Sequence, residues 1–219
     1  MRASRIGAQL PIELILLAAE YLAPADLLSL LYAAPGLACV LSFQHTTLQD
    51  EGGRTILHLL AMDGELMKLL LGNYSIRPDP KDNCGRTPLS YAAGGGNEAV
   101  VRLLLDQNVE ADSKDNDGLT PLSYAAGGGY ETVVRLLLDR QDVEADSKDN
   151  SGRTPLLYAA WRGHEAVVRL LLDQQDVQVD SKANWGRTPL SCATEGGHEA
   201  VVRLLLGRQD VQADSKDNC

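Results

Sequence analysis

Aromatic residues are scarce in this chain of 219 residues, where one Phe, two Trp and seven Tyr make up 5% of the sequence. Any core must therefore be built mainly from Leu, Val and Ala. Cysteine is also rare, and the four cysteines show no C-x-x-C spacing: Cys39, Cys84, Cys192 and Cys219. We expect reduced thiols in an intracellular protein of the cytoplasm or nucleus, because structural disulfides belong mainly to oxidising compartments.

Basic residues are the minority charge, since 20 Lys and Arg stand against 30 Asp and Glu, for a net charge of −10. An acidic chain is a poor fit to nucleic acid, which selects basic surfaces. Residues 1–48 hold two basic and three acidic residues, so the remaining 18 basic and 27 acidic residues carry the other −9. A basic partner surface would be attracted there, although solubility explains the charge about as well. No apolar stretch reaches 18 residues, so we predict no membrane span.

One motif is present in four near-copies. They read G-R-T-P-L-S-Y-A-A from Gly85, G-L-T-P-L-S-Y-A-A from Gly118, G-R-T-P-L-L-Y-A-A from Gly152 and G-R-T-P-L-S-C-A-T from Gly186. The copies begin 33, 34 and 34 residues apart, and each continues into V-V-R-L-L-L and then D-S-K. A fixed period of this length predicts a stacked array, because one such unit cannot bury its own apolar face.

Each unit is predicted to form two short helices and a polar turn. Thr87 is placed to cap a helix that begins at Pro88, since Pro is favoured at the first helical position. Gly96 is expected to end this helix in the left-handed conformation. Asn97 then opens a second helix, in which Val and Leu residues cover one broad face. The D-S-K-D-N stretch is expected to project as a hairpin-like turn.

These units resemble the ankyrin repeat, whose signature is T-P-L-H-x-A. Thr-Pro-Leu is present at 87–89, 120–122, 154–156 and 188–190, whereas the His of the signature is replaced by Ser90, Ser123, Leu157 and Ser191. A weaker first repeat begins near Gly53 and keeps the His as His58. In the family that His ties adjacent turns together, so its loss bears on local rigidity. The resemblance implies an all-α ankyrin-repeat solenoid over residues 51–219, with about five repeats and a truncated sixth.

Residues 8–48 do not follow the repeat, and their prolines and Pro35-Gly36 predict three short helices at about 11–22, 25–33 and 36–43. The pattern L-P-x-E-[LI]-L…Y-L…D-L-L-x-L is similar to an F-box, although the Trp often found near its end is absent. This resemblance implies docking on the Skp-type adaptor of a cullin-based ubiquitin ligase, in an F-box and ankyrin architecture common in fungi. The implied docking residues are Leu10, Pro11, Ile12, Leu14, Leu22, Leu27 and Leu28. The alternative is a helical cap that only shields the first repeat.

No catalytic or metal-binding constellation stands out. Asp115, Asp117 and Gly118 suggest a calcium loop, but Tyr124 occupies the place of its bidentate Glu. His164 and His198 align with Asn97 and Tyr130 in other repeats, which favours a helix-cap or packing role over a ligand role. No nucleophile, base and orienting group occur together. We therefore predict no enzyme activity, no metal and no cofactor.

The repeats differ from one another mainly around the Gly of the turn and at the end of the first helix. In the ankyrin family these positions face the concave groove and contact partners, and Trp and Arg are the residues most enriched in binding hot spots. The predicted groove residues are Arg86, Leu119, Arg153, Trp161, Arg162, Trp185, Arg187 and Glu195. The alternative is that the two Trp cover neighbouring backbone without a partner.

Two functional hypotheses remain open. In the first, the protein recruits a target through its groove and a ubiquitin ligase through its N-terminal segment. In the second, it is a plain ankyrin scaffold with a helical cap.

Overall fold

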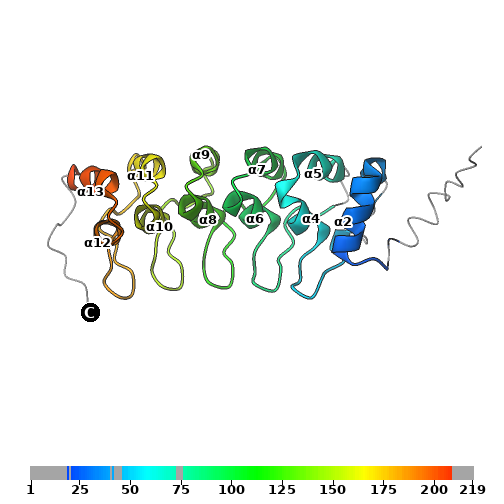
Figure 1. Cartoon of the computed structure of the whole chain (residues 1–219), viewed down its shortest axis with the longest axis horizontal. Coiled ribbons are helices and arrows are strands. Elements are labelled where there is room, and N and C mark those ends of the chain that lie inside the picture. Colours follow the sequence, from blue (N-terminus) through cyan, green and yellow to red (C-terminus); the bar gives the residue numbers. More distant parts are fainter. Residues whose placement is uncertain (1–18, 20, 40, 42–45, 73–75, 209–219) are drawn as a thin grey trace, which may run out of the picture.

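The computed structural model describes residues 19, 21–39, 41, 46–72 and 76–208, and within these ranges all regular elements are helices. The helices pair into repeats that stand side by side in an elongated array (Figure 1). The stacked array that the repeat period predicts and the all-helical solenoid that the ankyrin resemblance implies are confirmed.

The first helices of the repeats form one row and the second helices form another (Figure 1). The first row consists of α4 (Ile56–Leu59), which continues into the 3₁₀ helix η2 (Leu60–Met62), and of α6 (Pro88–Gly94), α8 (Pro121–Gly128), α10 (Pro155–Arg162) and α12 (Pro189–Glu195). The second row consists of α5 (Gly64–Leu71), α7 (Glu98–Leu105), α9 (Glu131–Leu138), α11 (Glu165–Leu172) and α13 (Glu199–Leu206).

The first helices begin as the sequence predicts. The Thr87 hydroxyl accepts a hydrogen bond from the backbone N–H of Ser90 at 3.2 Å, and Pro88 is the first helical residue. Gly96 follows the helix with φ +71°, in the left-handed region. A Cβ at Gly96 would also meet the ring of Tyr130 from the next repeat, so the glycine serves both the turn and the close approach of the two repeats.

One continuous apolar core runs through the rows. In the second, third and fourth repeats the paired alanines of the first helix are fully buried, as Ala92 and Ala93 are in α6. Their small side chains let neighbouring first helices approach closely. The second helices contribute buried Val and Leu residues, such as Val101 and Leu104 in α7. The scarcity of aromatic residues thus matches a core of thin aliphatic layers between closely stacked helices.

The N-terminal segment extends the stack. Helix α2 (Pro24–Ala33) confirms the helix predicted at 25–33 and contacts α4. The helix predicted at 36–43 is present in its described part as the 3₁₀ helix η1 (Pro35–Cys39), which contacts α5. The helix predicted at 11–22 lies almost entirely outside the described residues. Leu27 and Leu31 are fully buried in the common core, so α2 packs on the first repeat.

Candidate binding groove

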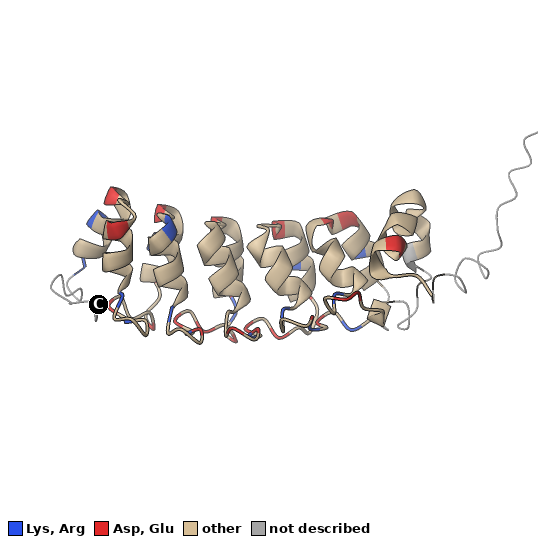
Figure 2. Ribbon diagram, turned by 60° about the horizontal axis from the view of Figure 1, so that its bottom comes forward, with Lys and Arg blue, Asp and Glu red and all other residues tan. Residues whose placement is uncertain are grey.

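The polar turn that precedes each first helix is called a finger here, and the fingers comprise residues 49–55, 81–87, 114–120, 148–154 and 182–188. All five project from the same side of the array (Figure 1). Acidic residues recur along the fingers and in the first turns of the second helices, with basic residues interspersed (Figure 2). The hairpin-like turn that the sequence predicts is therefore present in every repeat.

Each finger is bonded to the next by an asparagine. The Asn116 side chain donates to the carbonyl of Asn83 at 2.9 Å, and its backbone N–H donates to the carbonyl of Cys84, also at 2.9 Å. Asn150 and Asn184 repeat both bonds toward the preceding fingers. A Cβ at Gly85 would lie 2.5 Å from the Asn116 side chain, and its φ is +77°. These asparagine hydrogen bonds hold the finger tips at a fixed spacing, and the close approach of the asparagine requires glycine in the turn.

An aspartate at the base of the finger organises the turn in the second repeat. Asp82 Oδ1 accepts from the backbone N–H groups of Cys84 and Arg86, each at 2.9 Å. Its Oδ2 accepts from the Tyr91 hydroxyl at 2.8 Å and pairs with the Arg86 guanidinium at 3.0 Å. The guanidinium also lies over the Tyr91 ring, 4.6 Å from its centroid. We call this arrangement the Asp–Arg–Tyr cluster.

The fourth repeat has the same cluster, with Asp149, Arg153 and Tyr158. Burial raises the pKa of the Asp149 carboxyl, but the hydrogen bonds from Tyr158 and Arg153 outweigh it, so this pKa lies below its ordinary value. The carboxylate is therefore ionised and committed to its own repeat. The third repeat keeps the Asp115–Tyr124 bond but has Leu119 in place of the arginine.

The fifth repeat has lost two members of the cluster. Ala183 stands where the other repeats have aspartate, and Cys192 stands where the second, third and fourth repeats have tyrosine. Arg187 remains and pairs instead with Glu195 at 3.2 Å, an ion pair in which both side chains are exposed. The smaller side chains leave space between this finger and helix α12.

That space is a pocket of about 410 Å³ between the fourth and fifth repeats. Its floor contains Leu157, Ala183 and Cys192, which are all buried and form a small apolar cluster of their own. The described residues that line it are Ser151, Arg153, Leu157, Trp161, Ala183, Trp185, Arg187 and Cys192. We call it the Ala183–Cys192 pocket.

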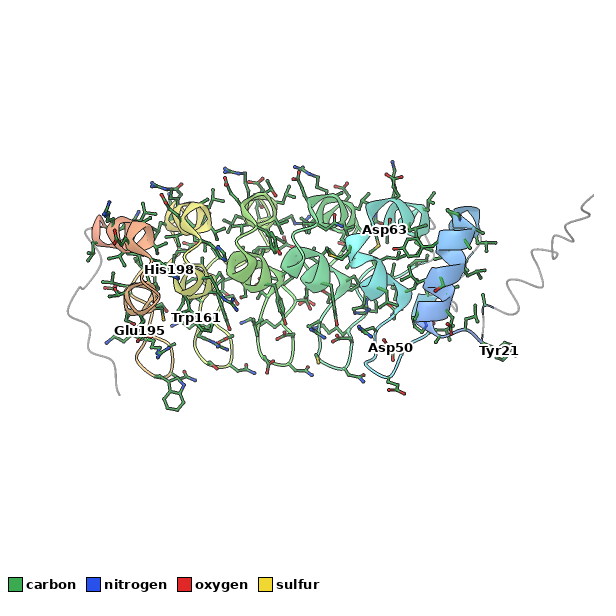
Figure 3. All side chains as sticks on the ribbon, in the orientation of Figure 1. Tyr21, Asp50, Asp63, Trp161, Glu195 and His198 are labelled. Carbon is green, nitrogen blue, oxygen red and sulfur yellow. The ribbon has the colours of Figure 1, made fainter. Side chains whose placement is uncertain are left out.

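Two exposed tryptophans flank the pocket. Trp161, at the end of α10, is 43% exposed, and Trp185, on the fifth finger, is 71% exposed. Figure 3 shows Trp161 and Glu195 on neighbouring first helices. The Arg162 guanidinium lies over the Trp161 ring, 5.4 Å from its centroid. An apolar floor with aromatic and guanidinium walls suits a side chain that is itself apolar or aromatic.

The predicted groove residues fall into two groups. Arg153, Trp161, Trp185 and Arg187 line the pocket, and Arg162 and Glu195 contact two of them. Arg86 and Leu119 belong to earlier fingers and do not line it. The sequence interpretation missed Leu157, Ala183 and Cys192 as groove residues. Leu157 stands where three other repeats have Ser, Ala183 where the other repeats have Asp, and Cys192 where three have Tyr, and these differences are the signal that could have found them.

The two histidines have a packing role, as predicted. His164 Nε2 donates to the carbonyl of Gly127 at 3.1 Å, and His198 Nε2 donates to the carbonyl of Trp161 at 3.0 Å. Both occupy the N-cap positions of second helices, but neither side chain caps its helix. Each instead ties its repeat to the preceding one, and His198 thereby holds the backbone of Trp161 at the pocket.

Three of the seven residues implied for adaptor docking lie in the described part of the chain, and they differ in exposure. Leu10, Pro11, Ile12 and Leu14 lie outside the described residues. Leu22 and Leu28 are half-buried against the core, and Leu27 is fully buried in it. A partner could reach Leu22 and Leu28 in this arrangement, whereas Leu27 is covered by the stack.

Among the described residues, no group of three or more His, Cys, Asp or Glu side chains is arranged to hold a metal ion. In the same part of the chain, no helix has the length and apolar character needed to cross a bilayer.

The family described as ankyrin repeats (3 copies) matches residues 15–115, 57–149, 96–183 and 140–217 in overlapping stretches. The chain belongs to the ankyrin-repeat family. The first match begins inside the 8–48 segment, so the family pattern overlaps the N-terminal helices as well as the repeats. The comparison with curated proteins finds no match. Ankyrin repeats are typically binding scaffolds rather than enzymes, and they indicate a protein–protein interaction role.

Proposed function

We propose that this ankyrin-repeat protein is an interaction adaptor that recruits a target protein through the groove between its fingers and first helices. The observation that carries the proposal is the Ala183–Cys192 pocket with Trp161 and Trp185 at its rim. Large exposed aromatic side chains beside arginine are the composition of binding hot spots. Elsewhere in the described residues, large exposed apolar side chains occur apart from such a pocket, as Tyr21 and Met62 do.

We predict that Trp161→Ala or Trp185→Ala weakens target binding roughly thirtyfold, because truncation of a hot-spot residue costs about 2 kcal/mol or more. The target is first identified by proximity labelling, and both variants are then titrated against it. Their melting temperatures are compared with the parent, so that lost affinity is not confused with lost folding.

Glu165→Ala is the matched control. Glu165 lies on α11, in the row of second helices, and pairs only with Arg169 of its own helix in the described contacts. Its loss should leave the affinity unchanged. Unchanged affinity in both tryptophan variants would place the binding surface elsewhere, most plainly on the acidic finger tips.

We further propose that residues 8–48 connect this groove to a ubiquitin ligase by docking on a Skp-type adaptor. The support is the sequence pattern around Leu10-Pro11 and Tyr21-Leu22, together with the exposure of Tyr21 and the partial exposure of Leu22 and Leu28. In this version the target held by the groove is presented for ubiquitin transfer.

The alternative is a plain ankyrin scaffold in which residues 8–48 only cap the stack. Its support is the burial of Leu27 and Leu31, whose side chains close the apolar face of the first repeat. A cap of this kind is what a solenoid needs at its end, where the apolar face would otherwise meet water.

The two versions differ in one binding measurement. If residues 10–28 form the adaptor contact, Leu10→Ala with Pro11→Ala should abolish binding of a purified Skp-type adaptor while far-UV helicity stays unchanged. Tyr32→Ala, at an exposed position on α2, is the control and should bind as the parent does. If the intact protein shows no affinity for the adaptor in a direct titration, the scaffold version holds and the groove proposal is unaffected.

A further inference from the structure

The Ala183–Cys192 pocket occupies a place that other repeats fill with their own side chains. In the second and fourth repeats, an Asp carboxylate and a Tyr ring both contact the arginine of the finger. In the fifth repeat, Ala183 and Cys192 remove both contacts, while Arg187 is retained. The molecule therefore contains two filled versions of the site and one that is open.

The filled versions show what chemistry the open one can accept. Arg86 and Arg153 each lie over a tyrosine ring, 4.6 and 5.0 Å from its centroid. Each also pairs with a buried carboxylate, at 3.0 Å from Asp82 and 2.8 Å from Asp149. A guanidinium between a ring face and a carboxylate gains from both, through cation–π attraction and charge-assisted hydrogen bonds.

We propose, building on the groove function proposed above, that the Ala183–Cys192 pocket binds a partner segment with an aromatic side chain next to an acidic residue. The aromatic ring takes the place that Tyr158 has in the fourth repeat and lies against Arg187. The carboxylate takes the place of Asp149 and pairs with Arg187. The partner thus supplies in trans the two side chains that the fifth repeat lacks.

The size and floor of the pocket fit an aromatic side chain. Its volume of about 410 Å³ lies within the range of small-ligand sites. Leu157 replaces the serine of the second, third and fifth repeats and adds apolar surface to the floor beside Ala183 and Cys192. Trp161 and Trp185 at the rim offer aromatic edges and faces to the same side chain.

The local charges favour a carboxylate beside that ring. Among the described residues, the pocket is lined by Arg153 and Arg187 and by no acidic side chain. Asp149, which lies two residues before Ser151 of the pocket lining, already accepts hydrogen bonds from Arg153, from the Tyr158 hydroxyl and from the Ser151 backbone N–H. Glu195 is the present partner of Arg187, but the side chains of both residues are exposed. Exposed ion pairs contribute little to stability, so a carboxylate of the partner can replace Glu195 at small cost.

The net charge of −10 of the chain does not prevent the pocket from binding a carboxylate of the partner at short range. Exposed charges farther away than about 8 Å are largely screened at physiological ionic strength. The arginines of the pocket wall therefore decide the preference for an acidic residue, whereas the total charge affects mainly the rate of encounter.

The test uses the whole purified chain and a displayed library of random twelve-residue peptides. Enriched peptides are synthesised and titrated against the parent and against the double variant Ala183→Asp, Cys192→Tyr. This variant rebuilds the Asp–Arg–Tyr cluster and closes the pocket from within. Its melting temperature should equal or exceed that of the parent, which makes it a folded control.

We expect the enriched peptides to share Phe, Tyr or Trp within two residues of Asp or Glu. They should lose at least about tenfold affinity for the double variant. In a double-mutant cycle, Arg187→Gln in the protein and Asp→Asn or Glu→Gln in the peptide should show coupling, because each removes one side of the same ion pair.

Peptides without the aromatic–acidic pair, peptides that bind the double variant equally well, or no enrichment at all would overturn this inference. Peptides that bind the double variant but lose affinity on Trp161→Ala would overturn it while supporting the groove function. Peptides that are insensitive to both changes would count against the pocket and the groove together.

Discussion

His58 shows how one side chain can join two repeats. Its Nδ1 accepts from the backbone N–H of Thr55 at 3.0 Å, and its Nε2 donates to the carbonyl of Arg86 in the next finger, also at 3.0 Å. Burial lowers the pKa of His58, which keeps the ring in the neutral form that these two bonds require. The serine side chain is shorter than that of histidine. The hydroxyls of Ser90 and Ser191 therefore form hydrogen bonds within their own repeats, with the capping residues Thr87 and Thr188.

We predict that Ser123→His stabilises the protein by restoring this link between the third and fourth repeats. The first repeat holds the same ring edge-on against Tyr91, and Tyr158 offers the third repeat an equivalent neighbour. One added hydrogen bond contributes about 1 kcal/mol, which raises the melting temperature of a chain of this size by roughly 2–4 °C. Ser123→Ala measures the loss of the serine hydroxyl separately. A histidine variant that melts below the alanine variant would show that the space is already filled.

At the scale of the element, the D-S-K segments at the start of the fingers carry half-buried carboxylates. Asp112 Oδ1 and Asp146 Oδ1 are buried with no hydrogen-bond partner, and the same holds for the hydroxyls of Ser113 and Ser147. Burial raises the pKa of Asp112 to about 6, and the charge of Glu144 adds to the effect. Burial also raises the pKa of Asp146. These carboxylates therefore oppose folding when they are ionised.

The sign of the pH dependence follows from these shifts. Asp112 titrates at about 6 in the folded chain and near 3.9 in the unfolded chain. Its contribution to stability is fully present below the lower value and is lost as the pH rises through about 6. Asp82 and Asp149 have lowered pKa values, so their contribution is lost as the pH falls instead.

We predict that Asp112→Asn raises the free energy of unfolding at pH 7.5, because it removes a buried charge and keeps an acceptor oxygen. The expected gain is on the order of 1 kcal/mol after allowance for the screening of a half-exposed group. At pH 4 the Asp112 carboxyl of the folded parent is protonated, so the difference in the free energy of unfolding between parent and variant should shrink toward zero. Urea unfolding of both proteins at the two pH values measures this difference. A variant that is less stable at pH 7.5 would contradict the assignment.

At the scale of the whole molecule, the array is a chain of nearest neighbours. Each inner second helix packs between two others, as α11 does between α9 and α13. Val168 and Leu172 of α11 are buried. At the corresponding positions of α13, Val202 is half-buried and Leu206 is 52% exposed. The stability of such arrays is a sum of repeat and interface contributions, so the repeat with fewer covered positions opens more readily.

We predict that amide hydrogens of residues 186–208 exchange faster than those of residues 118–151. Hydrogen exchange followed by mass spectrometry resolves the two stretches. The experiment is run at two protein concentrations, because pairing of two chains through α13 would slow exchange at the higher one. Stronger protection in residues 186–208 at both concentrations would contradict the nearest-neighbour account.

Much of the fold follows from local patterns. Thr-Pro at the helix starts and Gly at their ends act within a few residues, so the regular helices could be placed correctly from the sequence. Trp161 and Trp185 could be singled out because they break a repeated pattern. A helix at Pro35–Cys39 could also be expected, but its 3₁₀ type could not, because this short stretch has no repeat to compare with and packs against α5.

The pocket and the burial of the N-terminal helix were decided by packing between distant residues. Ala183 and Cys192 matter through the space that they do not fill, and that space exists only when the fifth finger folds against α12 beside Leu157 of the fourth repeat. Leu27 has the apolar character of a docking residue, yet contact with the first repeat covers it completely. A sequence records the apolar character of each side chain, whereas the neighbours that cover it, or leave it open, come from parts of the chain that meet only in the folded stack.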